Sequence, residues 1–161
     1  VVTDAVGKMA TGKMQGDKEK QFQKMMDTMI HTEKWTMRPW RMTLENQLSS
    51  WVMYIPGMKD SAEMKEMTKF KATLDTMSDE ELDNPDSIDM KTKERIAVKS
   101  GKSVEDINRM MMFYKQSLVV RNWLVLKNSL KETLPSTELE MRRMQENDIR
   151  LKKINQKVMA K

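Results

Sequence analysis

The side chains best suited to chemistry in this sequence are the cations of one short segment. Residues 91–102 hold five basic residues and a single acidic one, whereas residues 75–89 hold seven acidic residues and no basic one. So abrupt a change of sign indicates a compact basic patch, which is a plausible phosphate-binding surface. The alternative is a helix end whose lysines are simply solvated. The predicted RNA-binding residues are Lys91, Lys93, Arg95, Lys99, Ser100, Gly101 and Lys102.

Methionines form the second candidate site, because nineteen of the 161 residues are of this type. Methionine is unbranched and polarizable, so a surface built from it can repack around partners of different shape. One interpretation is a groove for apolar segments; the other, which spacing alone favours, is a helical core without a ligand. We expect no open groove in the mature assembly. The groove residues would be Met53, Ile55, Met58, Met64, Met67, Met110, Met111 and Met112.

Catalytic and metal chemistry find little support in the residue types. The chain has no cysteine, which excludes disulfides and cysteine-ligated zinc, and it has one histidine, His31. The acidic residues at 79–83 lack the spacing of a calcium loop. Ser49 and Ser50 lack the glycine elbow of a hydrolase nucleophile. We therefore predict a protein that is not an enzyme and that holds no cofactor and no metal.

Helices must position both candidate sites, and the fold class that we predict is all-α. With 33% charged residues, five glycines and four prolines, the composition is typical of a soluble helical chain rather than a β-rich one. Apolar residues recur at three- and four-residue intervals along most of the chain, which favours amphipathic helices. The predicted helices begin at about Lys18, after a loose start, and then cover about 40–53, 61–77, 78–83, 90–99, 103–117 or beyond, and 137–159.

A helix-turn-helix is predicted over residues 90–117, around the basic segment. Gly101 suits the left-handed end of a helix, and Ser103 with Asp106 is spaced as a capping pair for the next one. This is the shape that presents a helix to nucleic acid, although most such turns are structural. The second helix continues through Trp123 unless it breaks near Ser117, and the sequence leaves both possibilities open.

Three parts are predicted along the chain: an N-terminal extension over 1–34, a helical bundle over 35–133 and a basic C-terminal helix over 134–161. The last helix has only a thin apolar stripe, so we expect it to lie on a partner. No run approaches the roughly 20 apolar residues that a membrane-spanning helix needs. The start at Val1 fits a cleaved targeting peptide and equally a truncated start.

Several segments, in order, resemble one family. The string LDTMSDEELD over 74–83 is similar to the family pattern IDSM followed by EL, and Arg95-Ile-Ala is followed by Ser100-Gly101 as in its RIA…GSG run. VEDINR at 104–109 is similar to VQDVNR, and Ile-Pro-Gly at 55–57 stands where the family has the same tripeptide. Residues 35–127 thus resemble the methionine-rich M domain of the signal recognition particle's signal-sequence-binding protein.

The resemblance implies a helical bundle with a methionine-lined groove for signal peptides and a helix-turn-helix that binds the particle's RNA. Thr92 and Val98 stand where the family often has arginines, and Lys99 replaces its first glycine. Since lysine lacks the planar fork of arginine, we expect phosphate contact that is independent of RNA sequence. The glycine-containing step of the family's finger loop is absent at residues 43–46, where we expect continuous helix.

The expected function follows from the GTPase that such targeting proteins carry. Gly7-Lys8 and Gly12-Lys13 lack the spacing of a phosphate loop, so we expect a chain that acts without the GTPase. We therefore predict an RNA-contacting structural subunit of a large ribonucleoprotein, a mitochondrial ribosome, in contact with ribosomal RNA, neighbouring proteins and their apolar helices. Chloroplast and cytoplasm are the other predicted locations. The alternative function is a signal-peptide-binding or hydrophobic-helix-binding subunit, or a chaperone, in protein targeting.

Overall fold

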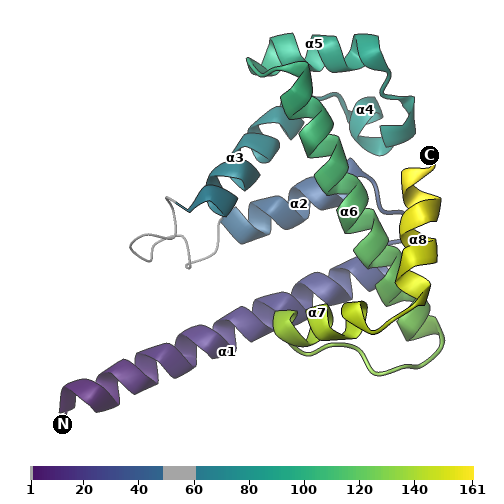
Figure 1. The fold of residues 1–161 in the computed structure, drawn as a ribbon. Helices are drawn as coiled ribbons and strands as arrows, with labels where there is room; N and C mark the ends of the chain where they lie inside the picture. Colours follow the sequence, from purple (N-terminus) through teal and green to yellow (C-terminus); the bar gives the residue numbers. More distant parts are fainter. Residues whose placement is uncertain (1, 49–60) are drawn as a thin grey trace. The chain divides into compact units, whose positions relative to one another are not determined.

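All regular structure in the part of the chain described by the computed structural model, residues 2–48 and 61–161, is helical (Figure 1), which confirms the predicted fold class. None of the helices found there is long and apolar enough to cross a membrane. The helices are α1 (Val2–His31), α2 (Met37–Leu48), α3 (Ala62–Leu74), α4 (Asp79–Asp83), α5 (Met90–Ser100), α6 (Val104–Ser129), α7 (Glu138–Glu146) and α8 (Arg150–Met159), with a 3-10 turn at Pro85–Ser87.

Two compact units make up the chain. Unit 1 comprises Val1–Thr32 and Val119–Lys157, and unit 2 comprises Glu33–Leu118 and Val158–Lys161. Helix α6 contributes its first part to unit 2 and its second part to unit 1, so the possible break near Ser117 does not occur. The three-part division read from the sequence stays a prediction.

Aromatic side chains form the centre of unit 2. The ring of Trp40 in α2 lies 6.1 Å from that of Phe70 in α3 and 5.8 Å from that of Tyr114 in α6. The buried hydroxyl of Tyr114 donates a hydrogen bond of 2.8 Å to the carbonyl oxygen of Trp35. The indole N–H of Trp35 donates in turn to Ser117 Oγ at 3.0 Å. These contacts hold the start of α2, and through it α3, on α6.

Helix starts in unit 2 follow local rules of capping. Helix α2 begins at Met37, three residues before the predicted start, and Pro39 lies in its first turn, where a missing N–H breaks no helical hydrogen bond. Helix α3 begins after Ser61, whose side chain accepts a hydrogen bond from the Met64 N–H at 3.2 Å. The predicted end of α2 near Met53 and the turn at 55–57 lie outside the described residues.

The predicted loose start of the chain is wrong, because α1 runs from Val2. The first sixteen residues contain three glycines but no proline. Each glycine in a helix costs about 1 kcal/mol relative to alanine, yet extension of an existing helix gains one hydrogen bond per residue. A helix nucleated downstream of Lys18 can therefore continue toward the N-terminus.

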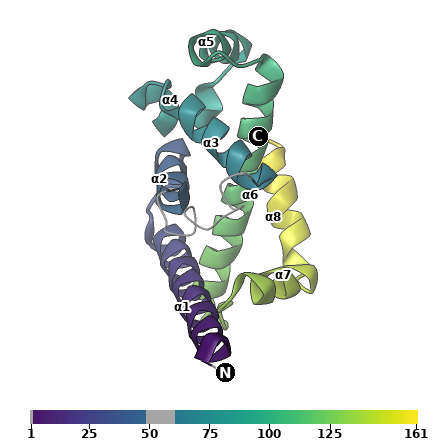
Figure 2. The same ribbon diagram turned by 90° about the vertical axis from the view of Figure 1, so that its left-hand side faces the viewer.

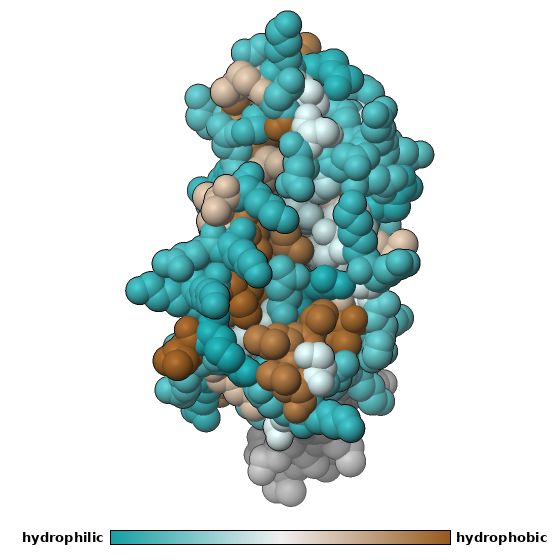
Figure 3. Space-filling model, turned by 90° about the vertical axis from the view of Figure 1, so that its right-hand side faces the viewer, coloured by the Kyte–Doolittle hydropathy of each residue, from teal (hydrophilic) through white to brown (hydrophobic). Residues whose placement is uncertain are grey.

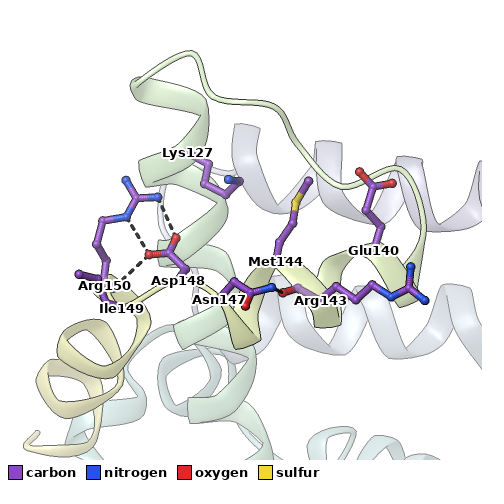
Figure 4. A pocket seen from close by; sticks show the side chains of 8 residues that line it. All are labelled: Lys127, Glu140, Arg143, Met144, Asn147, Asp148, Ile149 and Arg150. Carbon is purple, nitrogen blue, oxygen red and sulfur yellow. Dashed lines mark hydrogen bonds and ion pairs between the residues drawn. The ribbon is translucent and has the colours of Figure 1, made fainter.

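The predicted single C-terminal helix is also wrong, since α7 and α8 meet at a corner around Asp148. The Asp148 carboxylate accepts a hydrogen bond from the Trp123 indole at 2.8 Å and bonds the Arg150 guanidinium at 2.8 and 2.9 Å. Arg150 also bonds Glu132 at 2.7 and 2.8 Å, and Glu132 pairs with Lys127. This network ties the corner to the end of α6 within unit 1. Figure 4 shows the bonds between Asp148 and Arg150, with Lys127 of α6 nearby.

Candidate functional site

The turn between α5 and α6 is a well-formed helix end followed by a capped helix start. Gly101 has φ +69°, and the N–H of Lys102 donates to the Ala97 carbonyl at 2.9 Å, which closes α5. Ser103 and Asp106 cap α6 reciprocally, because each side chain accepts from the other residue's N–H at 3.1 Å. The predicted helix, glycine turn and helix are therefore present, at the upper end of unit 2 in Figure 1.

One of the predicted phosphate contacts, Arg95, also ties two helices together. Its guanidinium pairs with Glu81 at 2.9 Å, and the Glu81 side chain is only 11% exposed. Glu81 is also the second member of the predicted capping box of α4, where it accepts the Ser78 N–H at 2.9 Å. The Arg95 side chain is still 64% exposed, so it can contact a partner without giving up the ion pair that joins α5 to α4.

Four lysines of α5 and the turn that follows it are then the cations offered to a partner: Lys91 and Lys93 in the first turn of α5, and Lys99 and Lys102 on either side of Gly101. They are exposed or half-buried, and within the described part of the chain none of them forms an ion pair. Two nearby carboxylates, Asp89 and Asp106, are occupied as helix caps. Hydrogen bonds from Thr92 hold the pKa of Asp89 below its ordinary value, and those from Ser103 lower the pKa of Asp106, so both remain ionised at neutral pH.

The predicted groove residues fall into different environments. Met110 is 1% exposed and lies in the core of unit 2, whereas Met112 is 48% exposed. Met64 and Met67 in α3 and Met111 in α6 are half-buried. Met53, Ile55 and Met58 lie outside the described residues.

Phe113 is an exposed apolar residue that was not among the predicted groove residues. It is 38% exposed, and its ring centroid lies 5.0 Å from that of the buried Phe70 in α3. The Arg109 guanidinium lies 5.7 Å from the Phe113 ring and pairs with Glu66 of α3. These contacts hold α3 beside α6, as Figures 1 and 2 show. The signal was present in the sequence, since the five apolar residues 110–114 exceed one helical turn and cannot all be buried on one side.

A cavity of about 280 Å³ lies between α3 and the start of α6. It brings Lys102, a predicted phosphate contact, together with Lys69, which the sequence gave no reason to select. The lining residues are Glu66, Lys69, Phe70, Thr73, Lys102, Asp106 and Arg109.

Unit 1 has a larger and more open cavity of about 570 Å³ beside the α7–α8 corner (Figure 4). Among its lining residues Asp148 pairs with Arg150, and Lys127 pairs with Glu132, which lies outside the cavity lining. The face that carries α8 is largely hydrophilic, with hydrophobic side chains gathered in its lower half (Figure 3). Since the ion pairs of Asp148, Arg150 and Lys127 stabilise the corner between α7 and α8, we assign these residues a structural role and the cavity no ligand.

Comparison with known proteins identifies the scaffold. The family described as signal peptide binding domain matches residues 11–122. Similar chains include signal recognition particle 54 kDa proteins of Aeropyrum pernix (39% identical over 51 residues, 32% of this chain and 12% of the relative) and Archaeoglobus fulgidus (34% over 84 residues, 49% and 18%). That of Pyrococcus abyssi is 39% identical over 62 residues, which are 38% of this chain and 14% of the relative. No solved structure matches.

These findings correct the expected function. The predicted subunit of a mitochondrial ribosome is wrong, because the family match and the relatives all point to protein targeting, which was the alternative. The chain spans less than a fifth of the length of the relatives that it matches. The resemblance to the M domain is confirmed over most of the chain: this protein belongs to the signal peptide binding domain family of the signal recognition particle.

Proposed function

We propose that this chain binds the apolar segment of signal peptides on a surface formed by α3 and α6. The observation that carries the proposal is the exposure of Met112 and Phe113 on a helix whose neighbouring residues, Met110 and Tyr114, are buried. Met64 and Met67 of α3 are half-buried, and α3 contacts α6 through Phe70 and Phe113, so we assign the two methionines to the same surface. We call these residues, with Met111, the apolar face.

Rigid support under a soft surface suits this task. The ring contact between Phe70 and Phe113 and the ion pair between Glu66 and Arg109 hold the two helices in place. The methionines above can change rotamer and so accept apolar segments of different shape. Burial of each large apolar side chain contributes about 1.5–3 kcal/mol, so a few such contacts offset the cost of association.

Two matched methionine substitutions test the proposal. Met112→Gln places an amide on the apolar face, whereas Met90→Gln makes the same change at a residue that is 57% exposed at the start of α5. The assay is fluorescence anisotropy with a labelled signal peptide. We expect Met112→Gln to weaken binding about tenfold, which corresponds to about 1.4 kcal/mol, and Met90→Gln to leave it unchanged. Equal affinity of the two variants would contradict the assignment of the apolar face.

We propose RNA contact through the α5–α6 turn as a second function. Lys91, Lys93, Lys99 and Lys102 have no ion pair within the described residues. The first two lie at the start of α5, and the other two flank Gly101 in a turn that the Ser103–Asp106 pair also stabilises. Such an arrangement favours phosphate contact without base recognition, because lysine supplies charge rather than a planar fork.

Two triple substitutions test the RNA contact. Lys91, Lys93 and Lys99 are changed to Gln in one variant, and the exposed Lys18, Lys20 and Lys24 of α1 in the control, so both lose the same charge. Binding to poly(U) is measured at several salt concentrations. Each lost phosphate contact reduces the slope of log K against log salt by about 0.7 for single strands. We expect the first variant to lose about 2 in slope; equal loss in both variants would refute the assignment.

A further inference from the structure

We propose that the cavity between α3 and the start of α6 is a subsite for a phosphate group, contacted by Lys69 and Lys102. The inference rests on the proposed RNA contact and extends it from the α5–α6 turn to α3. Lys102 belongs to both places, since it follows Gly101 in the turn and also lines the cavity.

The size of the cavity suits a small group. Its volume of about 280 Å³ is just below the range of about 300–1,000 Å³ that pockets for drug-sized ligands occupy. Its floor is closed, because Phe70 and Thr73 are 5% and 4% exposed. The Thr73 hydroxyl already donates to the Lys69 carbonyl at 3.0 Å. The cationic groups at the rim are therefore what a ligand would meet.

Both carboxylates of the cavity are already engaged. Glu66 Oε2 accepts from Arg109 Nη2 at 3.1 Å, and Asp106 Oδ2 accepts from the Ser103 N–H at 3.1 Å. Neither Lys69 nor Lys102 forms an ion pair in the part of the chain that the structure describes. Hydrogen bonds from Ser103, and to a smaller extent the charges of Lys69 and Lys102, lower the pKa of Asp106. All three charged residues line the same cavity.

The resulting charge balance favours an anion. Glu66 and Arg109 cancel, and the two lysines face the single charge of Asp106, so the cavity keeps one positive charge in excess. A phosphate oxygen between the two ammonium groups would accept hydrogen bonds from both. The ligand is therefore a phosphate group, from an RNA backbone or as the free ion.

A pair of lysine substitutions on one helix tests the subsite. Lys65 and Lys69 are both exposed, and they lie one turn apart on α3, but only Lys69 lines the cavity. We expect Lys69→Gln to weaken binding to poly(U) about threefold to tenfold and to reduce the salt slope by about 0.7, whereas Lys65→Gln changes neither. A separate titration with inorganic phosphate, followed by the amide NMR signals of Thr73 and Asp106, should give saturable shifts in the wild type and none in Lys69→Gln.

The outcomes separate this inference from the proposed RNA contact. If Lys69→Gln binds poly(U) and inorganic phosphate as the wild type does, the subsite is refuted. Loss of poly(U) binding in the triple variant of Lys91, Lys93 and Lys99 would still support the RNA contact. If the triple variant also binds poly(U) as the wild type does, both the phosphate subsite and the proposed RNA contact are refuted. Phosphate shifts that Lys69→Gln abolishes, with unchanged poly(U) affinity, assign the subsite to the free ion. Circular dichroism of both single variants confirms that they are folded.

Discussion

Replacement of Gly101 by alanine isolates the backbone requirement of the helix-turn-helix. Gly101 has φ +69°, where a residue with a Cβ is disfavoured by about 1–2 kcal/mol. The reason is that the Cβ comes too close to the carbonyl oxygen that follows it in the chain. A Cβ built on Gly101 meets no other atom within 4 Å, so no steric clash with the surroundings adds to this cost. We expect Gly101→Ala to lower the free energy of unfolding of unit 2 by about 1–2 kcal/mol, and Gly101→Asn by less, since asparagine tolerates this conformation.

The same substitution at Gly16 is the matched control, with the opposite sign. Gly16 lies inside α1, its φ is helical, and a Cβ there also meets nothing within 4 Å. Alanine in a helix interior is favoured over glycine by about 0.8–1 kcal/mol. We therefore expect Gly16→Ala to stabilise α1 by an amount of that order.

Urea unfolding and native-state hydrogen exchange measure both effects. Hydrogen exchange reports α5 and α6 separately from α1, so each change is assigned to its own helix. The reasoning is refuted if Gly101→Ala leaves the protection of α5 unchanged, because the left-handed conformation would then carry no cost. It is also refuted if both substitutions change stability in the same direction.

Three further substitutions probe the core and the charge network. Tyr114→Phe should cost about 1–3 kcal/mol in urea unfolding, because it leaves the carbonyl of Trp35 without its buried donor. Met110→Ala should lower the free energy of unfolding by about 2–5 kcal/mol, as expected for a core residue. A change near zero would contradict the burial of Met110. Hydrogen bonds from Arg150 lower the pKa of Glu132 from 4.5 to about 2, so its contribution to stability is complete above pH 4.5 and is lost as the pH falls toward 2. Glu132→Gln should remove that part of the acid dependence of unfolding, and an unchanged acid profile would count against the ion pair.

The prediction of a ribosomal subunit was wrong because none of the features behind it specifies a particle. These features were the basic segments in the turn and at the two ends of the chain, together with the absence of a phosphate loop. Basic charge suits any RNA, and an absent motif identifies no partner. The ordered matches at 74–83 and 104–109 carried the correct information, because each combines a cap with a buried apolar pattern. The residues therefore predicted the family, and the same matches favoured protein targeting over a ribosome.

Local signals determined the parts of the fold that depend on a few neighbouring residues. The capping box of Ser78 and Glu81, the left-handed Gly101 and the reciprocal caps of Ser103 and Asp106 all occur where the sequence predicts them. Each is decided by hydrogen bonds between residues at most five positions apart, so the surrounding fold has little influence on it.

Only the tertiary structure decided the features that join distant segments. The corner at Asp148 exists because Trp123, 25 residues away, donates to its carboxylate. Met110 is buried and Met112 is exposed within one run of α6, and Lys69 of α3 lies at the same cavity as Lys102 of the basic turn. Identical residue types in one run thus differ in role according to which helix packs against them, and that packing depends on the whole chain.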